Sequence, residues 1–122
     1  MIRKLGTVAF FSILLGAALV GPAVADGDEV TVRGEILDMA CYIGHGATGE
    51  EHAPCAVKCV KGGQPMGLLS ADGEVYLLVA NHKDATAFEQ AKELAGKQVE
   101  LQGVSMSRDG IRAVEVLSVK KL

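Results

Sequence analysis

All three cysteines of this 122-residue chain and two of its three histidines lie in one segment, CYIGHGATGEEHAPCAVKC, between residues 41 and 59. Thiolate sulfur and imidazole nitrogen are the ligands that zinc, copper(I) and iron commonly take from proteins. The same side chains could instead form a disulfide, or a thiol pair for redox exchange. The segment therefore predicts a functional site and leaves three kinds of chemistry open.

Local signals within this segment predict a short helix. Thr48 and Glu51 fit a capping box, in which the two residues satisfy each other's backbone amides at a helix start. We expect the helix to run from about residue 49 to 60, and Gly62-Gly63 is suited to ending it.

Four side chains form the predicted metal-binding set. On the expected helix His52, Cys55 and Cys59 are spaced i, i+3 and i+7, which places them on one face. Cys41 would come from the end of the first predicted strand and could close over that face from the other side. Three thiolates and one imidazole make a complete tetrahedral set for zinc and also suit copper(I) or iron. The spacing is unlike the paired C-x2-C knuckles of zinc ribbons, so the metal is not specified.

Other polar residues have weaker claims to the site. His45, between two glycines, is either an alternative ligand or simply exposed. Asp38 lies three residues before Cys41 and could orient a histidine as an outer carboxylate. We expect His82 to be exposed and Met66 to belong to the core.

The cysteines also permit a structural disulfide or redox chemistry. A bond from Cys41 to Cys55 or Cys59 would close a loop of 14 or 18 residues and stabilise the chain by about 3 kcal/mol, leaving one thiol free. In a redox protein, Cys55 or Cys59 would attack and Cys41 would resolve. The C-x-x-x-C spacing differs from the C-x-x-C of thioredoxin-like proteins.

The N-terminus has the layout of a cleavable secretory signal over residues 1–25. A basic start is followed by the uncharged run LGTVAFFSILLGAALVG, then Pro22 and a small-residue A-V-A end, with cleavage expected after Ala25. An uncleaved membrane anchor is the alternative. We therefore expect a periplasmic or secreted domain over residues 26–122, with no stable membrane association after cleavage.

The charge of the expected mature chain excludes some partners. Removing Arg3 and Lys4 from the 12 basic residues leaves 10 against 15 acidic residues, a net charge of −5. Nucleic-acid binding depends on neutralising phosphates with basic side chains, so we expect no nucleic-acid partner. The partners that remain are a metal ion or an unknown protein.

Hydrophobic periodicity predicts a small barrel with inserted helices. Gly34 and Gly103 interrupt strand patterns, as glycines do where barrel strands bend. Five strands with a helix between the third and fourth is the order of an OB-like barrel, and a flat sheet is the alternative. The cysteine segment would then join strands one and two, a connection that OB domains use for ligands. The predicted strands are 30–39, 65–70, 74–80, 97–107 and 111–121, and the predicted second helix is 84–95.

The run GEILDMACYIGHGATGEEHAPCAVKCVKGGQPMGLL, with VYLLVAN and AGKQVELQG, resembles a group of uncharacterised small exported bacterial proteins. Their pattern combines D-x-x-C-Y with H-x-x-C-A-x-x-C, and the similarity covers almost all of residues 26–122. The resemblance implies an OB-like fold and a shared feature, but no activity. The residues that match this feature are Asp38, Cys41, His52, Cys55 and Cys59.

These observations favour an exported, non-enzymatic binding module that holds a soft metal ion, either for structure or for transfer to a partner. A periplasmic thiol-disulfide redox protein and a disulfide-stapled interaction domain without metal are the alternatives. No G-x-S-x-G elbow or paired carboxylates indicate a hydrolase.

Overall fold

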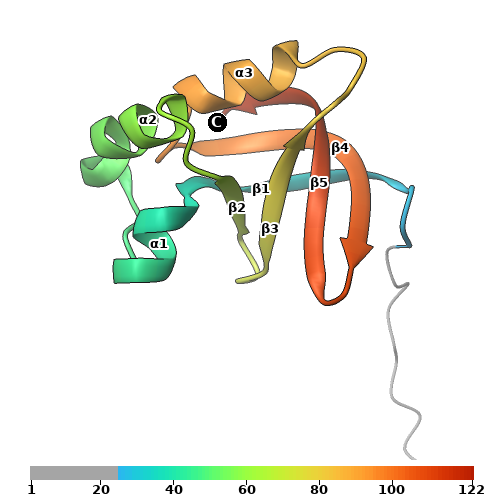
Figure 1. Ribbon diagram of the computed structural model, residues 1–122, viewed down its shortest axis with the longest axis horizontal. Helices are drawn as coiled ribbons and strands as arrows, with labels where there is room; N and C mark the ends of the chain where they lie inside the picture. The colour runs from blue at the N-terminus through green and yellow to red at the C-terminus, as the bar shows by residue number, and fades with distance from the viewer. Residues whose placement is uncertain (1–24) are drawn as a thin grey trace, which may run out of the picture.

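The computed structural model describes residues 25–122, and its strands close into a five-stranded barrel (Figure 1). The order around the barrel is β1-β2-β3-β5-β4, and β4 returns to β1. Only the β3–β5 pairing is parallel among these strands. The closed barrel is consistent with the OB-like prediction and rules out the flat sheet. The strands are β1 (Glu29–Asp38), β2 (Met66–Ser70), β3 (Val75–Ala80), β4 (Gln98–Arg108) and β5 (Ile111–Lys121).

The two glycines predicted at bends lie where strands approach closely. Gly34 pairs with both β2 and β4, and a Cβ there would overlap the backbone carbonyl of Leu69. Gly103 follows a register shift between β4 and β5, and a Cβ there would overlap the backbone of Glu115. Both positions therefore need glycine because no side chain fits between the backbones.

The barrel interior forms the core, and helix α3 (Thr86–Glu93) covers one end of it (Figure 1). Ala87 and Ala91 are the buried residues of α3, which follows β3 as predicted but is shorter than residues 84–95. Burial of these apolar side chains is the main force that holds the helix on the strands. Fully buried core residues from the strands include Ile36, Leu68, Val99, Leu101, Val114 and Val116.

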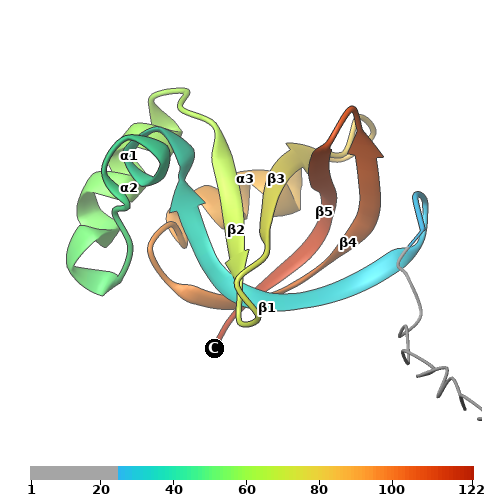
Figure 2. The same cartoon turned by 90° about the horizontal axis from the view of Figure 1, so that it is seen from below.

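Between β1 and β2 the structure has three helical pieces where the sequence predicted one. These are α1 (Met39–His45), the 3-10 turn η1 (Glu50–His52) and α2 (Ala53–Lys61). They lie beside the barrel at one end, as the view from below shows (Figure 2). The predicted capping box is wrong, because Gly49 occupies the N-cap of η1, at a φ of 90°, without a side-chain hydrogen bond.

The position predicted for Cys41 is also wrong. The first strand ends at Asp38, and Cys41 lies in the first turn of α1 rather than at a strand end. The chain turns into a helix there because the Asp38 side chain accepts hydrogen bonds from the amides that open α1.

The predicted signal segment, except its last residue Ala25, lies outside the described residues. Within residues 25–122, no helix is long and apolar enough to cross a membrane.

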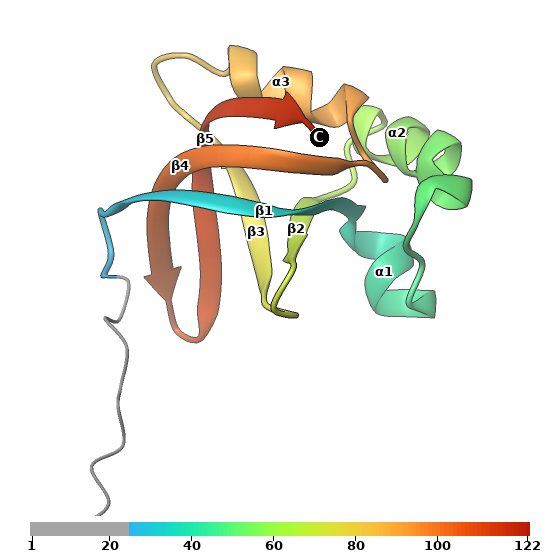
Figure 3. The same ribbon diagram turned by 180° about the vertical axis from the view of Figure 1, so that it is seen from behind.

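Gly96 lies in the chain that leads into β4 and packs closely against α2. The view from behind shows that this part of the chain runs beside α2 (Figure 3). Its amide donates to the Ile36 carbonyl at 2.7 Å, and its φ is +79°. A Cβ at this position would lie 2.5 Å from the Cα of Ala53, the first residue of α2. Gly96 thus serves the packing of α2 as well as the turn after α3.

We predict that Gly96→Ala lowers the free energy of unfolding by about 2–4 kcal/mol, because a left-handed backbone and overpacking both oppose the new methyl group. Gly73→Ala is the matched control, since its φ is +85° but no atom lies within 4 Å of the added Cβ. It should cost about 1–2 kcal/mol, from the backbone alone. Urea unfolding measures both, and equal losses would contradict the packing role of Gly96.

Candidate metal centre

A capped helix places Cys41. The buried Asp38 is 2% exposed, and its Oδ1 accepts from the amides of Ala40 at 3.0 Å and Cys41 at 3.4 Å. At the other end, Gly46 adopts a left-handed φ of 67°, and its amide donates to the Tyr42 carbonyl at 2.8 Å. Both ends of this short helix are therefore satisfied, which fixes the first turn that carries Cys41.

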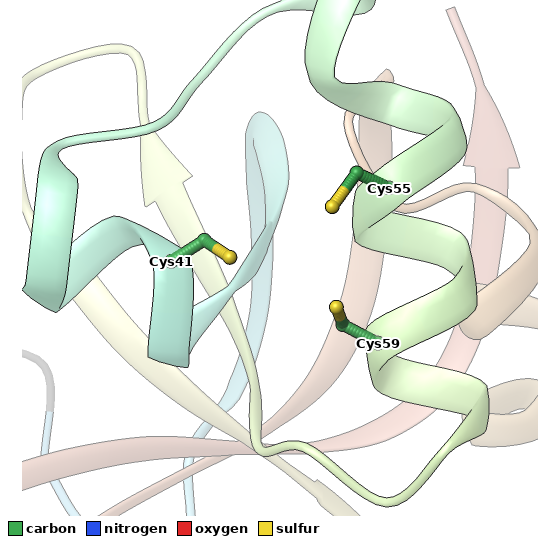
Figure 4. Close-up of side chains that lie close together, drawn as sticks. All are labelled: Cys41, Cys55 and Cys59. Carbon is green, nitrogen blue, oxygen red and sulfur yellow. The ribbon is translucent and has the colours of Figure 1, made fainter.

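Packing of α2 orients the other two cysteines. Ala53, Ala56 and Val60 form its buried face, and Ala56 and Val60 belong to the hydrophobic core. Cys55 and Cys59 lie one turn apart and project from α2 toward α1 (Figure 4). The apolar face against the barrel therefore determines where the sulfur-bearing face points.

Three sulfurs converge between the two helices. The Sγ atoms of Cys41, Cys55 and Cys59 lie within 4.8 Å of one another, and all three residues are free thiols (Figure 4). Zinc–sulfur bonds of about 2.3 Å in a tetrahedral site separate sulfurs by roughly 3.8 Å. A small inward movement would therefore let all three sulfurs contact one ion.

His52 joins a different group of donors. It lies within 4.8 Å of Asp38 and Cys41, and the structure does not gather it with Cys55 and Cys59 into a single cluster. The predicted spacing on one helical face does not apply, because His52 ends the 3-10 turn η1 and α2 begins at the next residue. The predicted four ligands are thus divided between two overlapping groups, which share Cys41 and include Asp38 as a fifth residue.

Two buried polar atoms of this second group have no hydrogen-bond partner. They are Oδ2 of Asp38 and Nε2 of His52. A buried polar atom without a partner typically costs about 1–3 kcal/mol, so such atoms are rare without a functional reason. Both atoms are chemically suited to bind a cation.

Asp38 and the thiols also shift one another's proton affinities. Burial alone would raise the pKa of Asp38, but the thiols of Cys41 and Cys59, with two backbone amides, hold it below its ordinary value. Both thiols lie close enough to the carboxylate to lower its pKa, although neither donates a hydrogen bond of good geometry to Oδ2. The Asp38 carboxylate and burial raise the pKa of Cys41 to about 12. Burial, Asp38 and Cys55 raise the pKa of Cys59. Both thiols are therefore protonated at neutral pH, and protonated thiols are weak nucleophiles.

Glu35 contributes to the site and was not predicted from the sequence. It is 8% exposed, and its Oε1 accepts from the Gly49 amide at 2.5 Å. This bond holds the segment between α1 and η1 against β1. Burial of the whole run GEILD is visible only in the structure, so the sequence pattern could not single out this glutamate.

The remaining sequence candidates lie outside both donor groups. His45 is exposed at the end of α1, and His82 is exposed as predicted. Met66 is 2% exposed and belongs to the core, also as predicted. A hollow of about 490 Å³ lies along β4 and β5 and is lined by residues such as Met106 and Ile111, with no cysteine or histidine among them. The chemistry is therefore concentrated between α1 and α2.

Comparison with protein-family models, with curated proteins and with solved structures finds no significant match to this chain. The resemblance to small exported bacterial proteins therefore stays a prediction.

We predict that Asp38→Ala lowers the free energy of unfolding by about 1 kcal/mol, because α1 loses the side-chain acceptor that caps its first turn. Asp38→Asn is the control, since its amide oxygen can still accept from Ala40 and Cys41. Hydrogen exchange of those two amides gives a local readout, with protection lost in the alanine variant and kept in the asparagine variant. If the amides of Ala40 and Cys41 stay as well protected in the alanine variant as in the asparagine variant, the cap does not hold the turn.

Proposed function

We propose that this chain is an exported binding module that holds a soft metal ion between α1 and α2. Cys41, Cys55 and Cys59 supply three thiolate ligands, and zinc, copper(I) or iron is the ion. The observation that carries the proposal is the convergence of all three sulfurs within 4.8 Å of one another. Thiolates select these metals over magnesium or calcium, which prefer oxygen ligands.

The arrangement of three sulfurs favours an ion over a disulfide. A disulfide uses two sulfurs and gives no reason for a third to lie equally close, whereas an ion is stabilised by each added thiolate. Two separately packed helices contribute the sulfurs, so binding would also join α1 to α2.

Exposure of the site favours exchange of the ion with a partner. Cys55 is exposed, and Cys41 and Cys59 are half-buried. An incoming ligand could therefore approach the ion from the Cys55 side. We further propose that the OB-like barrel presents this site in the periplasm or outside the cell. The partner would be an unknown protein that delivers the ion or accepts it.

A thiol-disulfide redox protein is the second candidate. One observation favours it: Cys41 faces both Cys55 and Cys59 across the gap between the helices, so it could pair with either (Figure 4). Metal analysis and thiol counting on the purified protein distinguish the two candidates, because redox function predicts a reversible disulfide and no bound metal.

We predict that protein produced from the full chain and purified under reducing conditions binds zinc or copper(I), and that Cys59→Ser weakens binding by roughly 100-fold. This loss corresponds to the share of one ligand in the binding free energy of a structural zinc site. Elemental analysis and competition with a chelator measure the effect. His45→Ala and His82→Ala are matched controls, because both side chains are exposed and lie outside the donor groups.

One result would contradict the metal site directly. If the protein carries no metal and thiol counting finds two cysteines oxidised, the sulfurs pair with one another. Cycling of that pair by dithiol reductants would then support the redox candidate, and resistance to them would indicate a structural staple.

A further inference from the structure

We propose that the site holds a second metal ion, bound by Asp38, Cys41 and His52, with the Cys41 thiolate bridging the two ions. This inference rests on the proposed function, which concerns only the ion among the three cysteines. The centre would then contain two divalent ions. The outer ion is bound by the three cysteines, and the inner ion is bound by the mixed donors Asp38, Cys41 and His52.

The positions of the donor residues support a bridged pair of ions. The two groups of donors each have all their ligand atoms within 4.8 Å of one another, and Cys41 belongs to both. A thiolate sulfur has several lone pairs and can bind two ions at once. The shared position of Cys41 is therefore what a bridging ligand requires, and no other residue belongs to both groups.

Two buried polar atoms without partners also favour an ion at this position. Asp38 is only 2% exposed, yet its Oδ2 has no partner, and the buried Nε2 of His52 has none either. Oδ1 of Asp38 is already used by the amides of α1, so Oδ2 remains free for another role. A cation bound by both atoms satisfies them together.

The charge of the site favours a second ion once the cysteines have bound the first. Binding of one divalent ion to all three cysteines displaces their thiol protons. The three thiolates and the Asp38 carboxylate then carry four negative charges, and one divalent ion compensates only two of them. Two nearby lysines are already paired, Lys61 with Glu93 and Lys97 with Glu50, and Lys58 of α2 is exposed to solvent. A second divalent ion neutralises the remainder, which matters because buried unpaired charge is strongly unfavourable.

The donor types narrow the choice of ion. The inner group offers one carboxylate oxygen, one imidazole nitrogen and one sulfur, a mixture that suits zinc or iron(II). Copper(I) prefers sulfur and would gain little from Asp38. We therefore assign the pair to two ions of one divalent metal, and zinc is the probe for the test.

The test is a zinc titration of the metal-free, reduced protein made from the full chain. We expect two zinc ions per chain in the unaltered protein and one in His52→Ala, with Asp38→Asn as a second variant that keeps the cap of α1. Cys41→Ser should weaken both sites, and His45→Ala should still bind two. Circular dichroism confirms that each variant is folded.

Cadmium-113 resonances give an independent readout of the same arrangement. Two signals are expected in the unaltered protein, and only the signal of the sulfur-rich site should persist in His52→Ala. A single ion that His52→Ala leaves unchanged would overturn the second site while leaving the proposed function intact. A single ion whose affinity falls in His52→Ala would also overturn it and make His52 the fourth ligand of one site. Binding of no ion would refute the proposed function itself.

Discussion

The carboxylate of Asp38 turns the end of β1 into a helix, and the position of Cys41 depends on that turn. If the strand simply continued, its next residues would extend along the barrel and Cys41 would leave the gap that faces α2. On the other side of the gap, α2 is held separately, by its apolar face on the core and by the close approach of Gly96. Two independent constraints therefore bring the sulfurs together.

Asp38 is also costly in this position, which connects stability to chemistry. A buried carboxylate needs partners for both oxygens, and the helix start satisfies only one of them. A carboxylate oxygen of Asp38 lies within 4.8 Å of the ligand atoms of Cys41 and His52. The residue that orders the backbone thus also gives the interior end of the site its negative charge.

The barrel could be predicted because its signals are local and repeated. Alternation in the first strand, and apolar runs joined by tight turns in the others, located all five strands, and Gly34 and Gly103, predicted as bends, lie at close approaches between strands. The site was predicted less well because competing local signals overlap. Asp38 and Gly46 are good cap residues for the helix between them, but the preceding period-2 pattern favoured a longer strand. Thr48 and Glu51 resemble a capping box, yet the backbone at Gly49 leaves the helical region before it can form.

The grouping of ligands could not be read from spacing alone. A separation of three residues places side chains on one face only if both lie in the same α-helix, and the 3-10 turn that ends at His52 breaks this condition. Which thiol shares its neighbours with the imidazole depends on how α1 packs beside η1, a tertiary relation that no local pattern encodes.

The hydrogen bond from the Gly49 amide to Glu35 divides the connection between Cys41 and Cys55 into two shorter spans. Closing one long flexible loop around an ion would remove much of the binding free energy as lost chain entropy. Here most of that entropy is already lost when the barrel folds, so the ligands are preorganised. An ion that binds these sulfurs would find them already close to their final positions. Loss of the hydrogen bond to Glu35 would therefore lower the affinity for the ion although every ligand is kept.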